Sequence, residues 1–200
     1  MKIAACCLAL ALALPAAAQT AAPAAPAKEA PVPAAPVANP ALTGLSMPWG
    51  RVKDILVRAA EKMPEEHYGF QPTPEVKTFG QFVGHTADAS FMMCAMALGE
   101  KNEPRDIEKK LTKKADLVAA LKESVAACDK VFTKTDADIA AATNLFGTQT
   151  TRFALAGFLV GHAFEHYGNM VTYMRIKGIV PPSSEPRPAA PKADAPKPGA

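Results

Sequence analysis

Two histidines four residues apart are the side chains of this sequence that most suggest chemistry. His162 and His166 belong to the run His-Ala-Phe-Glu-His within a long apolar segment. A spacing of four places both imidazoles on one face of a helix, one turn apart. Imidazoles on an otherwise apolar face are explained most simply by a divalent metal, which neutral imidazole binds well.

A third histidine, His85, lies on the apolar face of a second predicted helix. Three histidine ligands leave coordination positions open for water or substrate, as in catalytic rather than structural zinc sites. The alternative is that these histidines are core residues that donate to backbone carbonyls. The remaining histidine, His67, lies in a polar loop away from the helical faces, and we do not expect it to be a ligand.

Two carboxylates accompany the histidines in the sequence. Glu165 immediately precedes His166, and Asp88 follows His85 by three residues. Either carboxylate could orient an imidazole or act as a base toward water beside a metal. The alternative is a solvated or helix-paired carboxylate, so Glu165 and Asp88 are weak catalytic candidates.

Four segments with an apolar repeat of 3.6 residues must position these side chains. Their predicted limits are about residues 46–63, 78–98, 112–132 and 151–178. No segment alternates as a strand would, and no hairpin turn is predicted. Four amphipathic helices in one domain predict an all-α four-helix bundle, in which metal sites form between facing helices. Asn169 and Tyr173 share the histidine face and could bind substrate or only hydrogen-bond within the bundle.

Glycines directly precede two of the histidines, at Gly84 and Gly161. A glycine inside a helix costs about 1 kcal/mol relative to alanine. One interpretation is that the pair allows the two histidine-bearing helices to approach closely. The other is that they are simply small residues at a tight helix crossing.

The two ends of the chain differ in composition from its middle. A short apolar run followed by Pro15 and Ala16-Ala17-Ala18 predicts a signal peptide at residues 1–18, and hence a secreted or periplasmic protein. A lipoprotein cleavage box at Cys6 is the alternative. Residues 19–41 and 183–200 are rich in Ala and Pro, which predicts disordered tails around a bundle at residues 42–182.

Charge, hydropathy and cysteine content bear on which partners and which compartment suit this protein. The formal net charge is +3, and no basic segment is interleaved with aromatic residues, which argues against nucleic-acid binding. No apolar run after residue 18 is long enough for a membrane span. Cys94 and Cys128 could form a bridge in an oxidising compartment or remain two buried free thiols. Cys94 follows His85 by nine residues and so falls on the opposite helix face, away from the histidines.

Three stretches of the chain resemble the DinB family, also called the DinB/YfiT-like metalloenzymes. They are MPEEHYGFQP at residues 63–72, TFGQFVGHTAD at residues 78–88, and residues 162–182, which begin HAFEHYGNM. The resemblance covers roughly residues 45–182. It implies a four-helix bundle that holds one divalent metal ion, most often zinc or nickel, through His85, His162 and His166.

The resemblance also implies a class of activity. Relatives include metal-dependent thiol transferases and hydrolase-like or isomerase-like enzymes, so we expect a metal-dependent enzyme acting on a small, unknown substrate. A secreted member departs from this pattern, because cytosolic thiol cosubstrates are not expected outside the membrane. The alternative is a non-catalytic metal-binding or interaction module with a structural ion. A homodimer is one further option.

Overall fold

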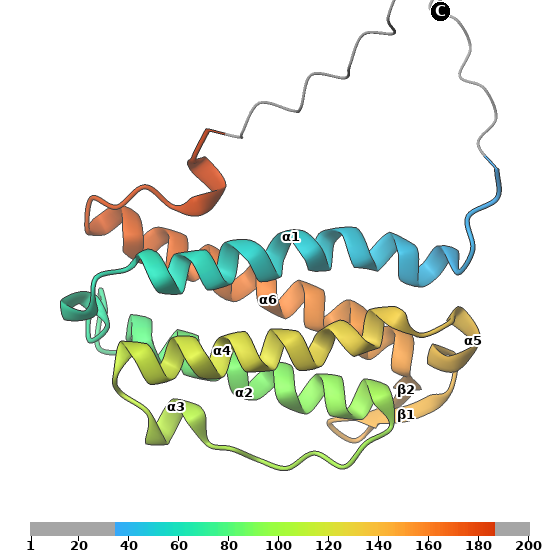
Figure 1. The fold of residues 1–200 in the computed structure, drawn as a ribbon. Coiled ribbons are helices and arrows are strands. Elements are labelled where there is room, and N and C mark those ends of the chain that lie inside the picture. Colours follow the sequence, from blue (N-terminus) through green and yellow to red (C-terminus); the bar gives the residue numbers. More distant parts are fainter. Residues whose placement is uncertain (1–34, 187–200) are drawn as a thin grey trace, which may run out of the picture. The chain divides into compact units, whose positions relative to one another are not determined.

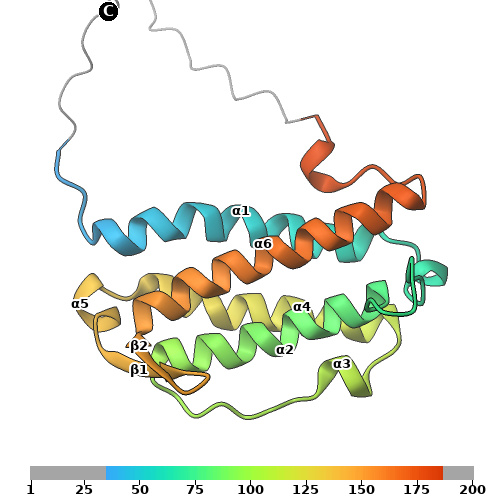
Figure 2. The ribbon, with the colours of Figure 1, turned by 180° about the vertical axis from the view of Figure 1, so that it is seen from behind.

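A computed structural model describes residues 35–186 of the chain. Its four long helices are α1 (Pro40–Lys62), α2 (Phe79–Leu98), α4 (Lys114–Asp129) and α6 (Arg152–Ile176) (Figure 1). Both α1 and α2 contact α4 and α6, so the four helices form a closed bundle, seen from behind in Figure 2. The predicted all-α four-helix bundle is confirmed. The predicted signal peptide, residues 19–34 of the linker and most of the C-terminal tail lie outside the described residues.

The short elements lie in the connections between the long helices, except for one 3-10 turn that follows α6. They are the 3-10 turns Glu65–His67, Lys130–Thr133 and Pro182–Ser184, the helices α3 (Ile107–Lys110) and α5 (Asp136–Ile139), and the strands β1 (Ala142–Leu145) and β2 (Thr148–Thr151). Within residues 35–186, no helix is both long enough and apolar enough to cross a membrane.

The hairpin of β1 and β2 contradicts the expectation that the chain has no strands. The two strands pair antiparallel, with Leu145 opposite Thr148, and leave Phe146 and Gly147 as the turn. Both turn residues have positive φ, 50° and 85°. Turns of this kind usually carry Asn-Gly or Asp-Gly. Because a phenylalanine occupies the first position here, the sequence pattern did not predict a hairpin turn.

Helix α1 begins at Pro40, six residues before the predicted start at Ser46. The Asp136 carboxylate accepts hydrogen bonds of 3.0 Å from the backbone N–H groups of Ala41 and Leu42. These groups have no partner within their own helix, so a carboxylate 95 residues away caps the helix. A cap supplied from so far along the chain leaves no local pattern in the sequence.

The ends of α2 agree with the sequence pattern. The Thr78 side chain accepts from the Gln81 backbone N–H at 3.1 Å, and the Gln81 side chain accepts from the Thr78 N–H at 2.8 Å. This capping box satisfies two backbone donors at the start of the helix. Gly99 ends the helix in the left-handed conformation, with φ of 77°.

A disulfide joins Cys94 of α2 to Cys128 of α4, with the two Cα atoms 5.2 Å apart. Of the two alternatives, free thiols or a bridge, the structure therefore has the bridge. Both cysteines lie in the apolar core between the helices. The covalent link fixes α2 against α4 on the side of α2 that does not carry His85.

The first residues of the predicted C-terminal tail pack on the bundle. The Ser183 backbone N–H donates to the Tyr167 hydroxyl at 2.9 Å. The Glu185 carboxylate pairs with Arg58 and Lys62 on α1. The ordered contacts therefore extend beyond residue 182, where the sequence composition changes.

Candidate metal centre

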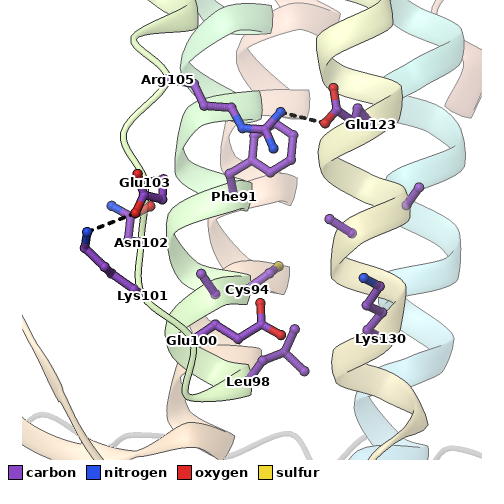
Figure 3. Close-up of a pocket in the computed structure, with 13 residues that line it drawn as sticks. Phe91, Cys94, Leu98, Glu100, Lys101, Asn102, Glu103, Arg105, Glu123 and Lys130 are labelled. Carbon is purple, nitrogen blue, oxygen red and sulfur yellow. Dashed lines mark hydrogen bonds and ion pairs between the residues drawn. The ribbon is translucent and has the colours of Figure 1, made fainter.

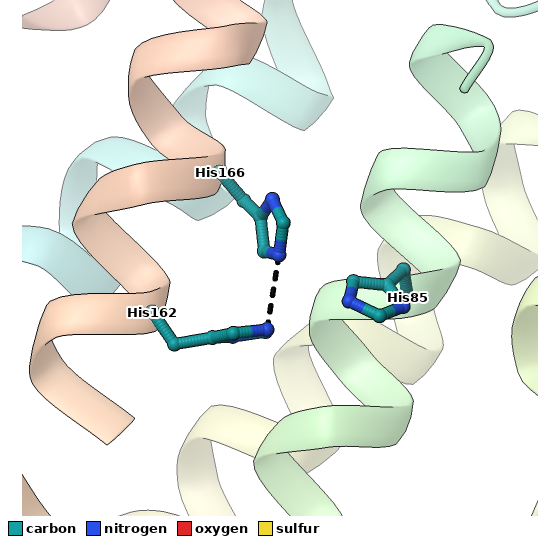
Figure 4. Close-up of side chains that lie close together, drawn as sticks. All are labelled: His85, His162 and His166. Carbon is teal, nitrogen blue, oxygen red and sulfur yellow. Dashed lines mark hydrogen bonds between the residues drawn. The ribbon is translucent and has the colours of Figure 1, made fainter. Parts of the chain in front are cut away.

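Three histidines meet between α2 and α6. His85 projects from α2 toward His162 and His166 on α6 (Figure 4). One ring nitrogen from each histidine lies within 4.8 Å of those of the other two. His166 is buried, whereas His85 and His162 are half-buried. The arrangement is one that a single ion could bind while remaining accessible from outside.

The electrostatic environment keeps two of these imidazoles neutral. Burial, together with the neighbouring imidazoles of His166 and His85, lowers the pKa of His162 to about 4. Burial, with His85 and Lys77 nearby, lowers the pKa of His166 to about 4 as well. A neutral imidazole offers a nitrogen lone pair, which is the form that binds a metal. A set of imidazole nitrogens suits zinc or nickel better than magnesium or calcium.

Glu108 is a residue of the site that the sequence did not reveal. Its Oε2 atom lies 3.0 Å from Nδ1 of His85, and its other oxygen pairs with Lys77. Burial raises the pKa of Glu108, but Lys77 and His85 more than offset this, so the pKa lies below its ordinary value. Glu108 follows His85 by 23 residues and comes from the short α3. No helical spacing relates the two residues, so no sequence pattern could pair them.

The two carboxylates that the sequence did suggest lie in different environments. Asp88 accepts hydrogen bonds from the backbone N–H groups of Ile107 and Glu108, at 3.0 Å and 2.9 Å. Both of its oxygens are therefore engaged in holding the start of α3. Glu165 is exposed on α6. Neither residue belongs to the histidine cluster.

The other polar candidates are engaged within the protein. Tyr173 donates from its hydroxyl to the Lys77 carbonyl at 2.8 Å. The Asn169 side-chain nitrogen lies 3.5 Å from Nδ1 of His166, at the limit of a hydrogen bond. His67 lies in the 3-10 turn after α1, outside the histidine cluster.

The two glycines do not bring α2 and α6 together as one interpretation suggested. A Cβ atom at Gly161 would meet no other atom within 4 Å. A Cβ at Gly84 would lie 2.7 Å from Cα of Glu108, closer than real Cβ contacts allow. Gly84 therefore permits close approach of α3, and not of α6.

A cavity of about 330 Å³ lies beside His85. Its walls come from α2, including Ala89 and Met92, and from the segment that leads to α3, including Pro104 and Arg105. This volume is at the lower end of the range of small-molecule sites. A small substrate bound there would lie next to one of the three imidazoles.

A larger cavity, of about 540 Å³, lies farther along α2 and is lined by residues of α2, α4 and the connection between α2 and α3 (Figure 3). There the Arg105 guanidinium stacks 3.6 Å above the centre of the Phe91 ring and pairs with Glu123 at 2.6 Å. None of the three clustered histidines lines this cavity. We therefore take the smaller cavity, which borders His85, as the candidate substrate site.

The fold of this chain is also found in solved structures. A DinB-like protein from Bacillus cereus ATCC 10987 is 18% identical, with a TM-score of 0.62 over 70% of this chain and 95% of that one. A DinB-like protein from Bacillus subtilis is 18% identical, with a TM-score of 0.55 over 68% and 92%. A conserved protein from Enterococcus faecalis is 17% identical, with a TM-score of 0.54 over 67% and 95%.

Of two sequence comparisons, one gives a match. No curated protein matches the chain in sequence. The family model described as the DinB superfamily matches residues 49–170, which include all three clustered histidines. This match spans more than half of the chain, and the chain therefore belongs to the DinB superfamily.

Proposed function

We propose that this protein is a metal-dependent enzyme that acts on a small polar substrate. His85, His162 and His166 hold one divalent ion, zinc or nickel. The observation that carries the proposal is the convergence of three imidazole nitrogens within 4.8 Å, next to a cavity that His85 borders. Among residues 35–186, no cysteine or carboxylate joins the three histidines as a fourth ligand.

The side chains of the site have distinct tasks in this proposal. The three imidazoles bind the ion, and burial keeps two of them neutral, so that protons do not compete for their nitrogens at neutral pH. Ala89 and Met92 form an apolar part of the wall of the cavity beside His85. A bound divalent ion supplies Lewis acidity, which polarises a carbonyl group and makes a water molecule more acidic.

Hydrolysis is the reaction class that we favour over thiol transfer. Thiol transfer would need a low-molecular-weight thiol as cosubstrate, which an exported protein would not meet in quantity. Both reactions would use the same three histidines, and substrate trials must therefore include both.

Export is part of the same proposal. We infer that residues 1–18 act as a cleaved signal peptide, so that the protein functions in the periplasm or outside the cell. The bridge between Cys94 and Cys128 supports this, because disulfides persist in oxidising compartments and are rare in the cytosol. N-terminal sequencing of exported protein should find a chain beginning at Gln19. A chain beginning at a lipidated Cys6 would contradict it.

The alternative function is a binding module in which the ion only braces α2 and α6. An enzyme needs a coordination position that substrate can reach, whereas a bracing ion is closed by protein atoms. The half-buried rings of His85 and His162 favour the open form.

Cobalt substitution distinguishes the two functions. The protein would be loaded with Co²⁺, and its visible spectrum recorded while azide or a small thiol is added. An open site exchanges a ligand, so the spectrum shifts with a saturable dependence on the added ligand. A spectrum that does not change with either ligand would indicate a closed, structural ion, and the enzyme proposal would then fail.

A further inference from the structure

We propose that Glu108 is the positioning residue of the metal site, and that α3 is folded against α2 in order to hold it. In this arrangement Glu108 fixes both the orientation and the tautomer of His85. The expected effect on metal affinity rests on the proposed metal site. The expected effect on the tautomer of His85 does not, because it is measured in metal-free protein.

The contact between Glu108 and His85 determines which nitrogen of the ring is free. The carboxylate Oε2 lies 3.0 Å from Nδ1 of His85, so a neutral ring donates to it from Nδ1–H. The lone pair is then on Nε2, the nitrogen on the other side of the ring. Metal-binding histidines commonly donate their second N–H to a carboxylate, which fixes the ring and makes it more basic.

His85 needs such a partner more than the other two histidines do. Its side chain is 32% exposed, and it comes alone from α2. His162 and His166 are neighbours on one helix, and their Nε2 atoms lie 3.0 Å apart. Without Glu108, the half-exposed ring of His85 could rotate away from α6 or adopt the other tautomer.

The backbone of Glu108 is held from two sides. Asp88, one turn after His85 on α2, accepts from the N–H groups of Ile107 and Glu108. The Ile107 side chain is buried in the core next to this contact. Gly84 provides the room, because a Cβ there would lie 2.7 Å from the Cα of Glu108. Residues on both sides of His85 in α2 therefore position the segment that supplies its partner.

The carboxylate itself is also fixed. Lys77 pairs with Oε1 of Glu108, so both oxygens are engaged. Lys77 is in turn tied to α6, because its carbonyl accepts from the Tyr173 hydroxyl at 2.8 Å. Glu108 thus links the ligand on α2 to the helix that carries the other two ligands. A carboxylate serving only as a surface ion pair would need none of this support.

Two variants of Glu108 and one control test the inference. E108A removes the acceptor, whereas E108Q keeps an oxygen that can accept from Nδ1–H. The control is E61A, which removes another ion-paired carboxylate, that of Glu61 with Lys122. Far-UV circular dichroism would check that all three variants keep the helical fold.

The first readout is the tautomer of His85 in metal-free protein, from ¹⁵N NMR of the ring. The spectra would be recorded at about pH 8.5, well above the ordinary histidine pKa of about 6.5. Wild type, E108Q and E61A should have the proton on Nδ1, and E108A should shift it toward Nε2. An Nδ1–H ring in E108A, or an Nε2–H ring in wild type, would overturn the inference whether or not the protein binds metal.

The second readout is zinc affinity, measured by competition with a chelator. E108A should weaken binding by about 10- to 100-fold, as other losses of such partners do. E108Q should recover most of that loss, and E61A should bind as wild type does. If wild type binds zinc and E108A binds within twofold of it, Glu108 does not position the ligand. If wild type binds no metal, the proposed function fails, and the tautomer alone decides the inference.

Discussion

The Nε2 atoms of His162 and His166 lie 3.0 Å apart on successive turns of α6. Two nitrogen ligands about 2.0 Å from one tetrahedral ion would be separated by roughly 3.3 Å, so little movement is needed for both to bind it. Because each imidazole is then a direct ligand, alanine in place of His85, His162 or His166 should weaken zinc binding by at least about 100-fold. Metal titration of the three variants would measure this loss.

His67→Ala is the matched control for these substitutions. It also removes an imidazole, but from the 3-10 turn outside the cluster. Its zinc stoichiometry should stay near one ion per chain. Metal lost in H67A but kept in the other three variants would show that the site has been assigned to the wrong histidines.

The second prediction concerns the pH dependence of stability in metal-free protein. The pKa values of His162 and His166 are about 4 in the folded protein, below the unfolded value of about 6.5. Between these values the unfolded chain binds more protons than the folded one, so the free energy of unfolding decreases as pH falls. Urea midpoints should therefore be lower at pH 5 than at pH 7.

A double variant isolates this effect from the rest of the chain. With His162→Gln and His166→Gln, the part of the pH dependence due to these two groups should disappear. An unchanged difference between pH 5 and pH 7 would mean that other groups produce it. A wild-type midpoint that rises on acidification would contradict the lowered pKa values themselves.

The third prediction concerns the bridge between α2 and α4. Cys94 and Cys128 are 34 residues apart in sequence, and closing a loop of this length contributes about 3–4 kcal/mol in the chain-entropy model. Reduction, or alanine at both positions, should lower the melting temperature by about 10 °C. Calorimetry with and without a reductant would measure this. Two free thiols in unreduced, exported protein would contradict the bridge.

The fourth prediction concerns where the folded unit ends. A chain trimmed to residues 42–182, the limits that composition suggests, loses Ala41, one of the two residues that Asp136 caps, and Glu185 with its pairing to Arg58 and Lys62. Since a helix cap contributes about 1 kcal/mol, this chain should melt a few degrees below one trimmed to residues 36–186. Equal melting temperatures would show that these contacts add nothing measurable.

The features predicted correctly from the sequence depend on residues close together in the chain. The spacing of His162 and His166 and the capping box at Thr78 are of this kind. The features that were missed depend on distant partners: Asp136 for the start of α1, and Glu108 for His85. The hairpin was missed for another reason, because Phe146 occupies a turn position where asparagine is usual. The start of α1 and the partner of His85 are therefore determined by tertiary contacts, which the apolar periodicity of the sequence does not reveal.

Helix α2 is linked to two neighbouring helices in two different ways. Its Cys94 is bonded to α4, and its His85 faces the histidines of α6 on the other side. Among the four long helices of residues 35–186, α1 alone carries neither a bridged cysteine nor a clustered histidine. A metal-loaded, oxidised protein should therefore open from α1 inward, and native-state hydrogen exchange should show the amides of α1 exchanging through smaller openings than those of α2.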